Sequence, residues 1–190
     1  MESIILASAS PRRQELLQQI GVPFVVVKSD AEEILDHADG PRALAVENAR
    51  RKVLAVAKMH PGRIVLGADT VVFQDGEVYG KPKDAADACA MLRRFAGRRH
   101  AVVTGVALVS RDGTCRTDAA ETNVCFADMT DEEIAAYVAT GEPMDKAGAY
   151  ALQGRGGMFV ERIEGSYSNV IGLPMALARE MLLSAGVTNL

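Results

Sequence analysis

Residues 64–79, with the sequence IVLGADTVVFQDGEVY, contain the pattern most informative about the fold. The apolar and small residues at 64–68 are typical of a strand buried on both faces, as in a sheet covered by helices. After Asp69 and Thr70, a second apolar run meets Asp75-Gly76, a signal for a tight hairpin turn. The stretch therefore predicts a buried strand, a polar junction at Asp69 and Thr70, and a hairpin.

Strands and helices alternate on both sides of this stretch. Apolar periodicity and capping signals predict strands at 4–7, 24–27, 100–110, 114–126 and 158–161, and helices at 11–20, 41–60, 84–95, 130–140 and 174–184. The two long strands flank Asp112-Gly113, which we expect to place Cys115 opposite Ser110. The predicted fold class is α/β, a long mixed sheet flanked by helices with a cleft along it.

Composition limits the number of domains, the partners and the cellular compartment that fit this chain. The 190 residues, 48% hydrophobic and 24% charged, predict one domain spanning 1–190. A net charge of −4 disfavours a duplex nucleic acid as partner. No segment has the ~20 apolar residues of a membrane span, and the acidic N-terminus is unlike a signal peptide. Cys89, Cys115 and Cys125 are expected to be free thiols in a reducing cytoplasm.

The segment Ser8-Ala9-Ser10-Pro11-Arg12-Arg13 combines hydroxyls and guanidinium groups at the start of a helix. Free N–H groups and the helix dipole favour an anion there, and arginine suits phosphate oxygens. The alternative is that Ser10 only caps the helix and that both arginines are solvated. Two cations at a helix N-terminus oppose the dipole, which favours the phosphate site.

Other polar residues are candidates for catalysis and cation binding. Asp69 follows a buried strand, the usual place of a catalytic or metal-binding acid, although turns also place aspartates there. Lys52 and Lys81 can supply charge to a polyphosphate, and Lys52 alone also fits a helix-edge lysine. Glu33, Glu47 and Asp69 are oxygen donors suited to Mg²⁺, and no motif fixes which of them bind it.

The loop at 145–154 ends in Gln153, whose amide can donate and accept hydrogen bonds as base recognition requires. By itself this segment is more typical of a surface loop. The following Gly154-Arg155-Gly156-Gly157 adds nothing to an assignment. The three histidines have neither the spacing of a zinc site nor that of a Ser-His-Asp triad.

Seven segments together resemble the Maf family of nucleoside triphosphate pyrophosphatases. They are 8–13, 47–52, 67–72, 80–82, 100–106, 145–150 and 169–174. The resemblance implies a two-lobed fold similar to the inosine triphosphate pyrophosphatases (Maf/Ham1-like), with a substrate cleft between the lobes. It also implies hydrolysis of a nucleoside triphosphate to the monophosphate and pyrophosphate with a divalent cation, Mg²⁺ or Mn²⁺.

The resemblance also implies roles for individual residues. Asp69 matches the family's proton acceptor, and the phosphate-binding positions match Ser8, Arg12, Lys52 and Lys81. We expect Arg13 to hold the triphosphate with them. Arg13, Thr70 and Gln153 match the specificity positions of the branch acting on dTTP and UTP. Modified pyrimidine nucleotides are left open as further substrates. The alternatives are the branch preferring 7-methyl-GTP, a phosphatase releasing orthophosphate, and a non-catalytic nucleotide-binding regulator of cell division. The oligomeric state is left open, with a homodimer as one option.

Overall fold

The computed structural model describes residues 3–188, in which seven strands form one sheet. The strands are β1 (Ile4–Leu6), β2 (Phe24–Val26), β3 (Val65–Gln74), β4 (Glu77–Tyr79), β5 (Arg99–Val109), β6 (Cys115–Phe126) and β7 (Val160–Glu164). Their order is β2-β1-β3-β5-β6-β7, and β4 pairs with β3. β1 runs parallel to β2 and β3, whereas β4 and β7 are antiparallel to their neighbours. The predicted mixed sheet is confirmed.

Helices follow the strands along the chain. The α-helices are α1 (Pro11–Gln19), α2 (Pro41–Met59), α3 (Ala85–Phe95), α4 (Asp131–Val138), α5 (Tyr167–Ile171) and α6 (Met175–Ser184). The 3₁₀ helices are η1 (Glu142–Asp145), η2 (Ala147–Ala149) and η3 (Arg155–Phe159). Prolines open α1 and α2 as predicted, and Thr130 with Glu133 forms a complete capping box on α4. The short helix α5 was not predicted.

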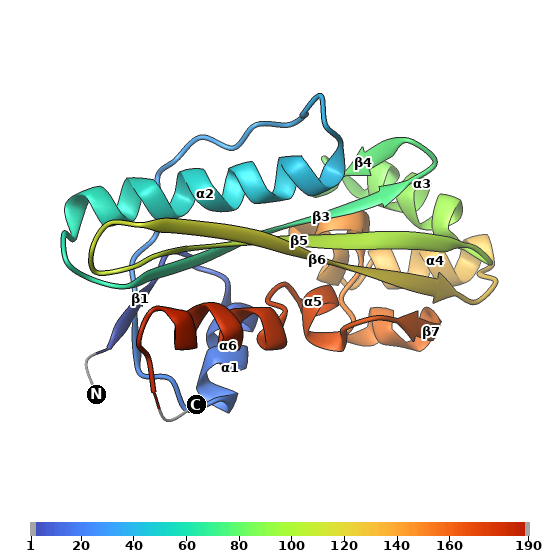
Figure 1. The fold of residues 1–190 in the computed structure, drawn as a ribbon. Helices are drawn as coiled ribbons and strands as arrows, with labels where there is room; N and C mark the ends of the chain where they lie inside the picture. Colours follow the sequence, from blue (N-terminus) through green and yellow to red (C-terminus); the bar gives the residue numbers. More distant parts are fainter. Residues whose placement is uncertain (1–2, 189–190) are drawn as a thin grey trace. The chain divides into compact units, whose positions relative to one another are not determined.

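The chain divides into two compact units. The first consists of Met1–Asp69, Thr104–Ala120 and Gly172–Leu190, and the second of Thr70–Val103 and Glu121–Ile171. In the first unit, α2 lies along one face of the strands, and α1 and α6 lie on the other (Figure 1). In the second unit, an apolar core includes Phe95, Phe126 and Tyr150.

The contact between α2 and the sheet depends on two glycines of the first unit. A Cβ atom on Gly105 of β5 would lie 2.3 Å from the backbone of Ala45, and one on Gly67 of β3 would lie 2.6 Å from Val53. Neither position has room for a side chain. α2 therefore sits close enough to the sheet for its polar side chains to reach a residue of β3.

Two expectations about the strands are wrong. β3 continues through Asp69 and Thr70 to Gln74 without the expected junction, because the residues on both sides continue the same extended strand. The Ser110 N–H donates to the Thr114 carbonyl (2.9 Å), so Thr114 and not Cys115 lies opposite Ser110. The turn takes the three-residue form, with Gly113 at a φ of +85°, which shifts the register by one residue.

Candidate active site

The carboxylate of Asp69 is the centre of the candidate active site. β1 pairs with β3 only as far as Leu66, and the N–H of Ala7 donates to the Leu66 carbonyl (2.8 Å). Asp69 therefore lies just beyond the carboxyl end of β1, where open α/β sheets place their ligands. Only 8% of Asp69 is exposed, and a carboxylate this buried requires polar partners.

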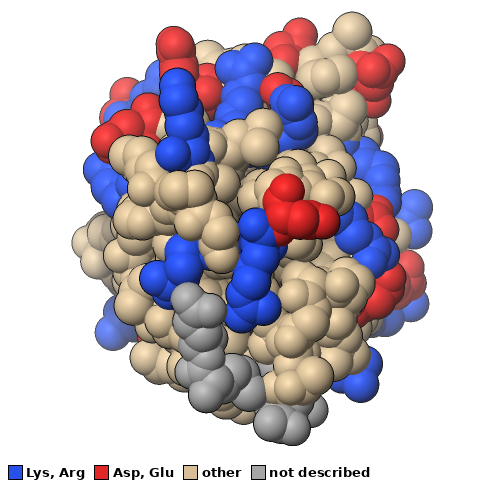
Figure 2. Space-filling view, turned by 60° about the vertical axis from the view of Figure 1, so that its left-hand side comes forward, with Lys and Arg blue, Asp and Glu red and all other residues tan. Residues whose placement is uncertain are grey.

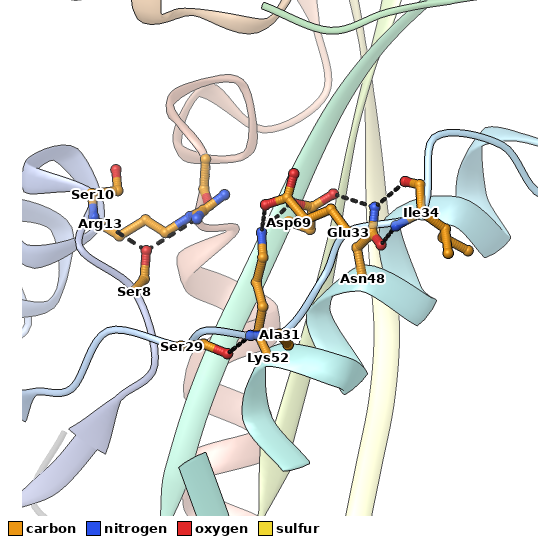
Figure 3. A network of polar contacts seen from close by, with 11 residues as sticks. Ser8, Ser10, Arg13, Ser29, Ala31, Glu33, Ile34, Asn48, Lys52 and Asp69 are labelled. Carbon is orange, nitrogen blue, oxygen red and sulfur yellow. Dashed lines mark hydrogen bonds and ion pairs between the residues drawn. The ribbon is translucent and has the colours of Figure 1, made fainter. Parts of the chain in front are cut away.

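Lys52 is the main partner of that carboxylate. It reaches from α2 so that its Nζ lies 2.6 Å from Oδ1 of Asp69 and 2.6 Å from Oε1 of Glu33 (Figure 3). Glu33 comes from the acidic loop between β2 and α2. One ammonium thus joins two carboxylates from separate segments. The side chains of Lys52 and Asp69 are 14% and 11% exposed, so solvent screens this pair weakly.

Asn48, one helical turn before Lys52, joins the same network. Its Nδ2 donates to Oδ2 of Asp69 (3.4 Å) and to the carbonyl of Ile34 (3.0 Å), while its Oδ1 accepts the N–H of Ile34 (2.9 Å). This buried amide fixes the loop that carries Glu33. The sequence analysis assigned no role to Asn48, and its i, i+4 spacing from Lys52 was the signal that could have identified it.

The start of α1 supplies a second group of polar side chains. Arg13 donates through Nη1 to the Ser8 Oγ (3.1 Å) and through Nε to the Gly172 carbonyl (2.7 Å). Ser8 Oγ also accepts the N–H of Ser10 (3.2 Å), whereas the Ser10 side chain forms no cap on α1. The alternative of Ser10 as a simple helix cap is therefore wrong. Arg12 lies beside Arg13 in the first turn and is partly exposed.

Arg13 extends from α1 toward the Asp69 carboxylate (Figure 3). Burial lowers the pKa of Arg13, while the negative charges of Asp69 and Glu33 act in the opposite direction. An arginine side chain stays positively charged in proteins. The first unit therefore brings Arg13, Lys52 and two carboxylates into one electrostatic group.

Glu47 does not join this network. Its carboxylate pairs with Arg51 (3.0 Å) and Arg50 (3.4 Å) on α2. Successive helical residues differ by about 100° in direction, so Glu47 and Asn48 cannot share a face. Within residues 3–188, no group of three or more His, Cys, Asp or Glu side chains forms a ready metal site.

The second unit holds the other predicted site residues. Thr70 follows Asp69 on β3 and points to the opposite face, as successive strand residues do. Lys81 is exposed after β4, and the carbonyl of Gly80 accepts the N–H of Gly148 (3.0 Å). Two of the segments that carried the family resemblance therefore meet in this unit. Gln153 lies in an exposed turn before η3.

The surface charges, the helices and the cysteines can each be compared with what the composition predicts. Figure 2 shows basic side chains lying next to acidic ones on the face that is drawn. No helix among residues 3–188 is long and apolar enough to cross a membrane. Cys89, Cys115 and Cys125 are free thiols, as predicted.

The fold matches two solved structures over nearly the whole chain. The Ham1 protein of Staphylococcus aureus superposes with a TM-score of 0.57 at 17% identity, covering 96% of this chain and 99% of that one. A HAM1 protein from Coxiella burnetii gives 0.51 at 15% identity, covering 94% and 100%. At these identities the likeness defines the class of fold, an α/β protein of the Ham1 type.

Sequence comparison defines the family. The model of the Maf-like protein family matches residues 3–185, and the chain belongs to that family. A dTTP/UTP pyrophosphatase of Symbiobacterium thermophilum is 53% identical, covering 98% of this chain and 95% of that protein. A dTTP/UTP pyrophosphatase of Bacillus cytotoxicus is 50% identical, covering 95% of each.

Proposed function

We propose that this chain hydrolyses dTTP and UTP to the nucleoside monophosphate and pyrophosphate. The observation that carries the proposal is the buried Asp69 carboxylate, held by Lys52 and Asn48 just beyond the end of β1. The names of the relatives, dTTP/UTP pyrophosphatase at 53% and 50% identity, support the choice of substrate. We place the reaction in the cytoplasm, and the three free thiols support that location.

In the proposed reaction, Asp69 orients a water molecule and accepts its proton as the water oxygen attacks the α-phosphorus. A bond forms between that oxygen and the α-phosphorus. The bond from the α-phosphorus to the oxygen bridging the β-phosphorus breaks, and its electron pair leaves with pyrophosphate. Asn48 and Lys52 hold the carboxylate in one orientation, which is the main protein contribution to a reaction dominated by positioning.

Positive side chains of the first unit bind the triphosphate in this proposal. Arg13 is held by Ser8 and Gly172, so its orientation is set before a ligand arrives. Arg12 and Lys52 add charge in the first unit. Lys81 keeps its phosphate-binding role in this proposal on the family resemblance alone. Forked arginine donors match phosphate oxygens, and lysine supplies a point charge.

A divalent cation, Mg²⁺ or Mn²⁺, would neutralise charge on the triphosphate and on the leaving pyrophosphate when bound. Glu33 and Asp69 fit this role because both carboxylates lie 2.6 Å from the same Lys52 Nζ atom, so their oxygens are near one another. Two carboxylates with water and phosphate are a donor set that Mg²⁺ accepts. Glu47 is left out because its carboxylate pairs with Arg50 and Arg51 on α2 and does not join the network of Asp69, Lys52 and Glu33.

Specificity for the base is assigned to Arg13, Thr70 and Gln153, in line with the family branch that they match. The Gln153 amide would hydrogen-bond the pyrimidine edge. A site built on such bonds rejects a mismatched base strongly because buried polar groups are then left unpaired.

The experiment is a panel of dTTP, UTP, CTP, GTP and 7-methyl-GTP with Mg²⁺, in which monophosphate, pyrophosphate and orthophosphate are quantified separately. Preferential conversion of dTTP and UTP to monophosphate and pyrophosphate is expected. A preference for 7-methyl-GTP would overturn the specificity assignment, and orthophosphate release would overturn the reaction. Binding without turnover would instead identify a nucleotide sensor.

A further inference from the structure

The loop that carries Gln153 is held at both ends by two side chains outside it. On one side of Gln153, the N–H of Ala151 donates to the Tyr137 hydroxyl oxygen (3.1 Å). On the other side, the N–H groups of Arg155 and Gly156 each donate to the Glu142 carboxylate, both at 3.0 Å. Each anchored residue lies within three positions of Gln153.

The two anchoring side chains are themselves joined. The Tyr137 hydroxyl donates to Oε1 of Glu142 at 2.8 Å, so the carboxylate accepts three hydrogen bonds. Tyr137 is 4% exposed and its ring packs edge-on against Phe159. Burial raises the pKa of Tyr137 well above its ordinary value, which keeps the hydroxyl protonated as a donor.

Glu142 is ionised in this arrangement. Burial by itself raises the pKa of Glu142, but the N–H groups of Gly156 and Arg155, the Tyr137 hydroxyl and the charge of Lys146 outweigh it and hold the pKa below its usual value. Hydrogen bonds to an ionised acceptor are roughly twice as strong as neutral ones. The backbone of the Gln153 loop is therefore held by hydrogen bonds to a negatively charged carboxylate.

Glycines allow this close approach. A Cβ atom on Gly154 would lie 2.4 Å from a carboxylate oxygen of Glu142, and one on Gly156 would lie 2.5 Å from the Tyr137 hydroxyl oxygen. Both distances are shorter than any real contact of a Cβ atom. The glycine-rich segment to which the sequence assigned no role is the part of the loop that wraps around Glu142.

We propose that Glu142, acting with Tyr137, is a positioning residue for base discrimination. It fixes the backbone on both sides of Gln153 so that the exposed amide is presented in one orientation. An amide on an unanchored turn would lose that orientation, and a displacement of about 1 Å costs up to about 100-fold in rate. The inference rests on the proposed function, since it assumes that Gln153 contacts the base.

The first variant is Glu142→Gln, which keeps the size and shape of the side chain. It replaces one of the two carboxylate oxygens that accept hydrogen bonds from the loop with an NH₂ group, which cannot accept them. The measured quantity is the ratio of kcat/KM for UTP to kcat/KM for CTP. We expect this ratio to fall by about 10- to 100-fold. Tyr137→Phe, which keeps the ring and removes the hydroxyl, is the second variant and should lower the ratio in the same direction. A merely structural role would lower both kcat/KM values equally and leave the ratio unchanged, which would overturn the inference.

A double variant tests whether Glu142 acts through Gln153. If it does, Glu142→Gln changes the ratio in the wild-type background and not in the Gln153→Ala background. An equal fall in both backgrounds would contradict the inference.

The matched control is Thr130→Ala, which removes the capping box of α4, the helix that carries Tyr137, and makes no contact with the loop. It should lower Tm while preserving the ratio.

Amide hydrogen exchange separates this inference from the proposed function. Exchange at Arg155 and Gly156 is measured by NMR without nucleotide. We expect it to accelerate by about tenfold or more in Glu142→Gln, because hydrogen bonds to a charged carboxylate are replaced by weaker or missing ones. Unchanged exchange would overturn the inference whatever the substrate. A wild-type protein that does not prefer UTP over CTP would instead refute the proposed function, while the exchange result would still stand.

Discussion

At the scale of single residues, the candidate site depends on a few buried polar groups that satisfy one another. Asp69, Lys52 and Asn48 form a connected set in which each charge or amide has a partner. Removing one member leaves the others without compensation in a weakly solvated place. Substitutions here should therefore affect chemistry and stability together, and each experiment needs both measurements.

Asp69→Asn keeps the size of the side chain and removes the proton acceptor. We expect kcat for UTP to fall by about 10²–10⁴, the range typical of a lost general base, with a smaller effect on nucleotide affinity. Steady-state kinetics and nucleotide titration measure the two effects, and a thermal melt confirms that the variant is folded. Turnover at the wild-type rate would exclude the catalytic role.

The two glutamates proposed from the sequence as metal ligands should behave differently. Glu33→Gln is expected to raise the Mg²⁺ concentration needed for half-maximal activity by about tenfold or more, because one of two charged oxygen donors is lost. Glu47→Gln should not change it, because that carboxylate pairs with arginines. Activity measured over a Mg²⁺ titration compares them. The opposite order would show that Glu47 is the ligand.

At the scale of elements, the distance between α2 and the sheet sets the reach of Lys52 and Asn48. Gly105 permits that distance, because its Cα faces the backbone of Ala45 and Val46 with no intervening side chain. The element is also well defined by its own sequence, with Pro41 at its start and a buried apolar stripe. The local sequence therefore defines the bounds of the helix, while its distance from the sheet depends on glycine.

Gly105→Ala should destabilise the protein by about 1–3 kcal/mol, since overpacking against backbone cannot be relieved by a rotamer change. Urea unfolding measures the change. Gly80→Ala is the matched control, since no atom lies within 4 Å of the added methyl group, and it should stay within about 0.5 kcal/mol of wild type. A Gly105→Ala variant as stable as this control would show that α2 can move away from the sheet freely.

At the scale of the whole molecule, stability should depend on pH through a buried histidine. His100 is 2% exposed on β5, stacks on Phe95 and shares a 2.9 Å hydrogen bond with the Tyr150 hydroxyl. Burial lowers the pKa of His100 to about 3. The folded protein therefore keeps this ring neutral, whereas the unfolded chain protonates it near the ordinary value of 6.5.

Between pH 6.5 and 3 the unfolded chain binds one proton more than the folded chain at this position. The free energy of unfolding should therefore fall as the pH falls, by up to about 1.4 kcal/mol per pH unit from His100 alone. His100→Gln removes the titration and should give a shallower slope over this range in urea unfolding at several pH values. Parallel curves for the two proteins would contradict the assignment.

Turns and helix caps, which are formed by residues a few positions apart in the sequence, could be predicted from the sequence. The Asp75-Gly76 turn pairs Gln74 with Glu77, and the Thr130–Glu133 capping box forms on α4. Asp69, Lys52 and Arg13 of the candidate site were also named from the sequence, whereas Asn48 was not. Turns and caps depend on backbone preferences and hydrogen bonds within a few residues, which the order of amino acids determines directly.

Contacts between segments far apart in the sequence became known only from the folded structure. The sequence did not indicate that Asn48 links Asp69 to the Glu33 loop, that Glu47 stays outside the network, or that Glu142 anchors the Gln153 turn. It also placed a junction in β3 and a register at Ser110 that the fold does not have. Each of these features depends on contacts between residues far apart in the sequence. Packing and hydrogen bonding in the folded protein determine such contacts, whereas local backbone preferences do not.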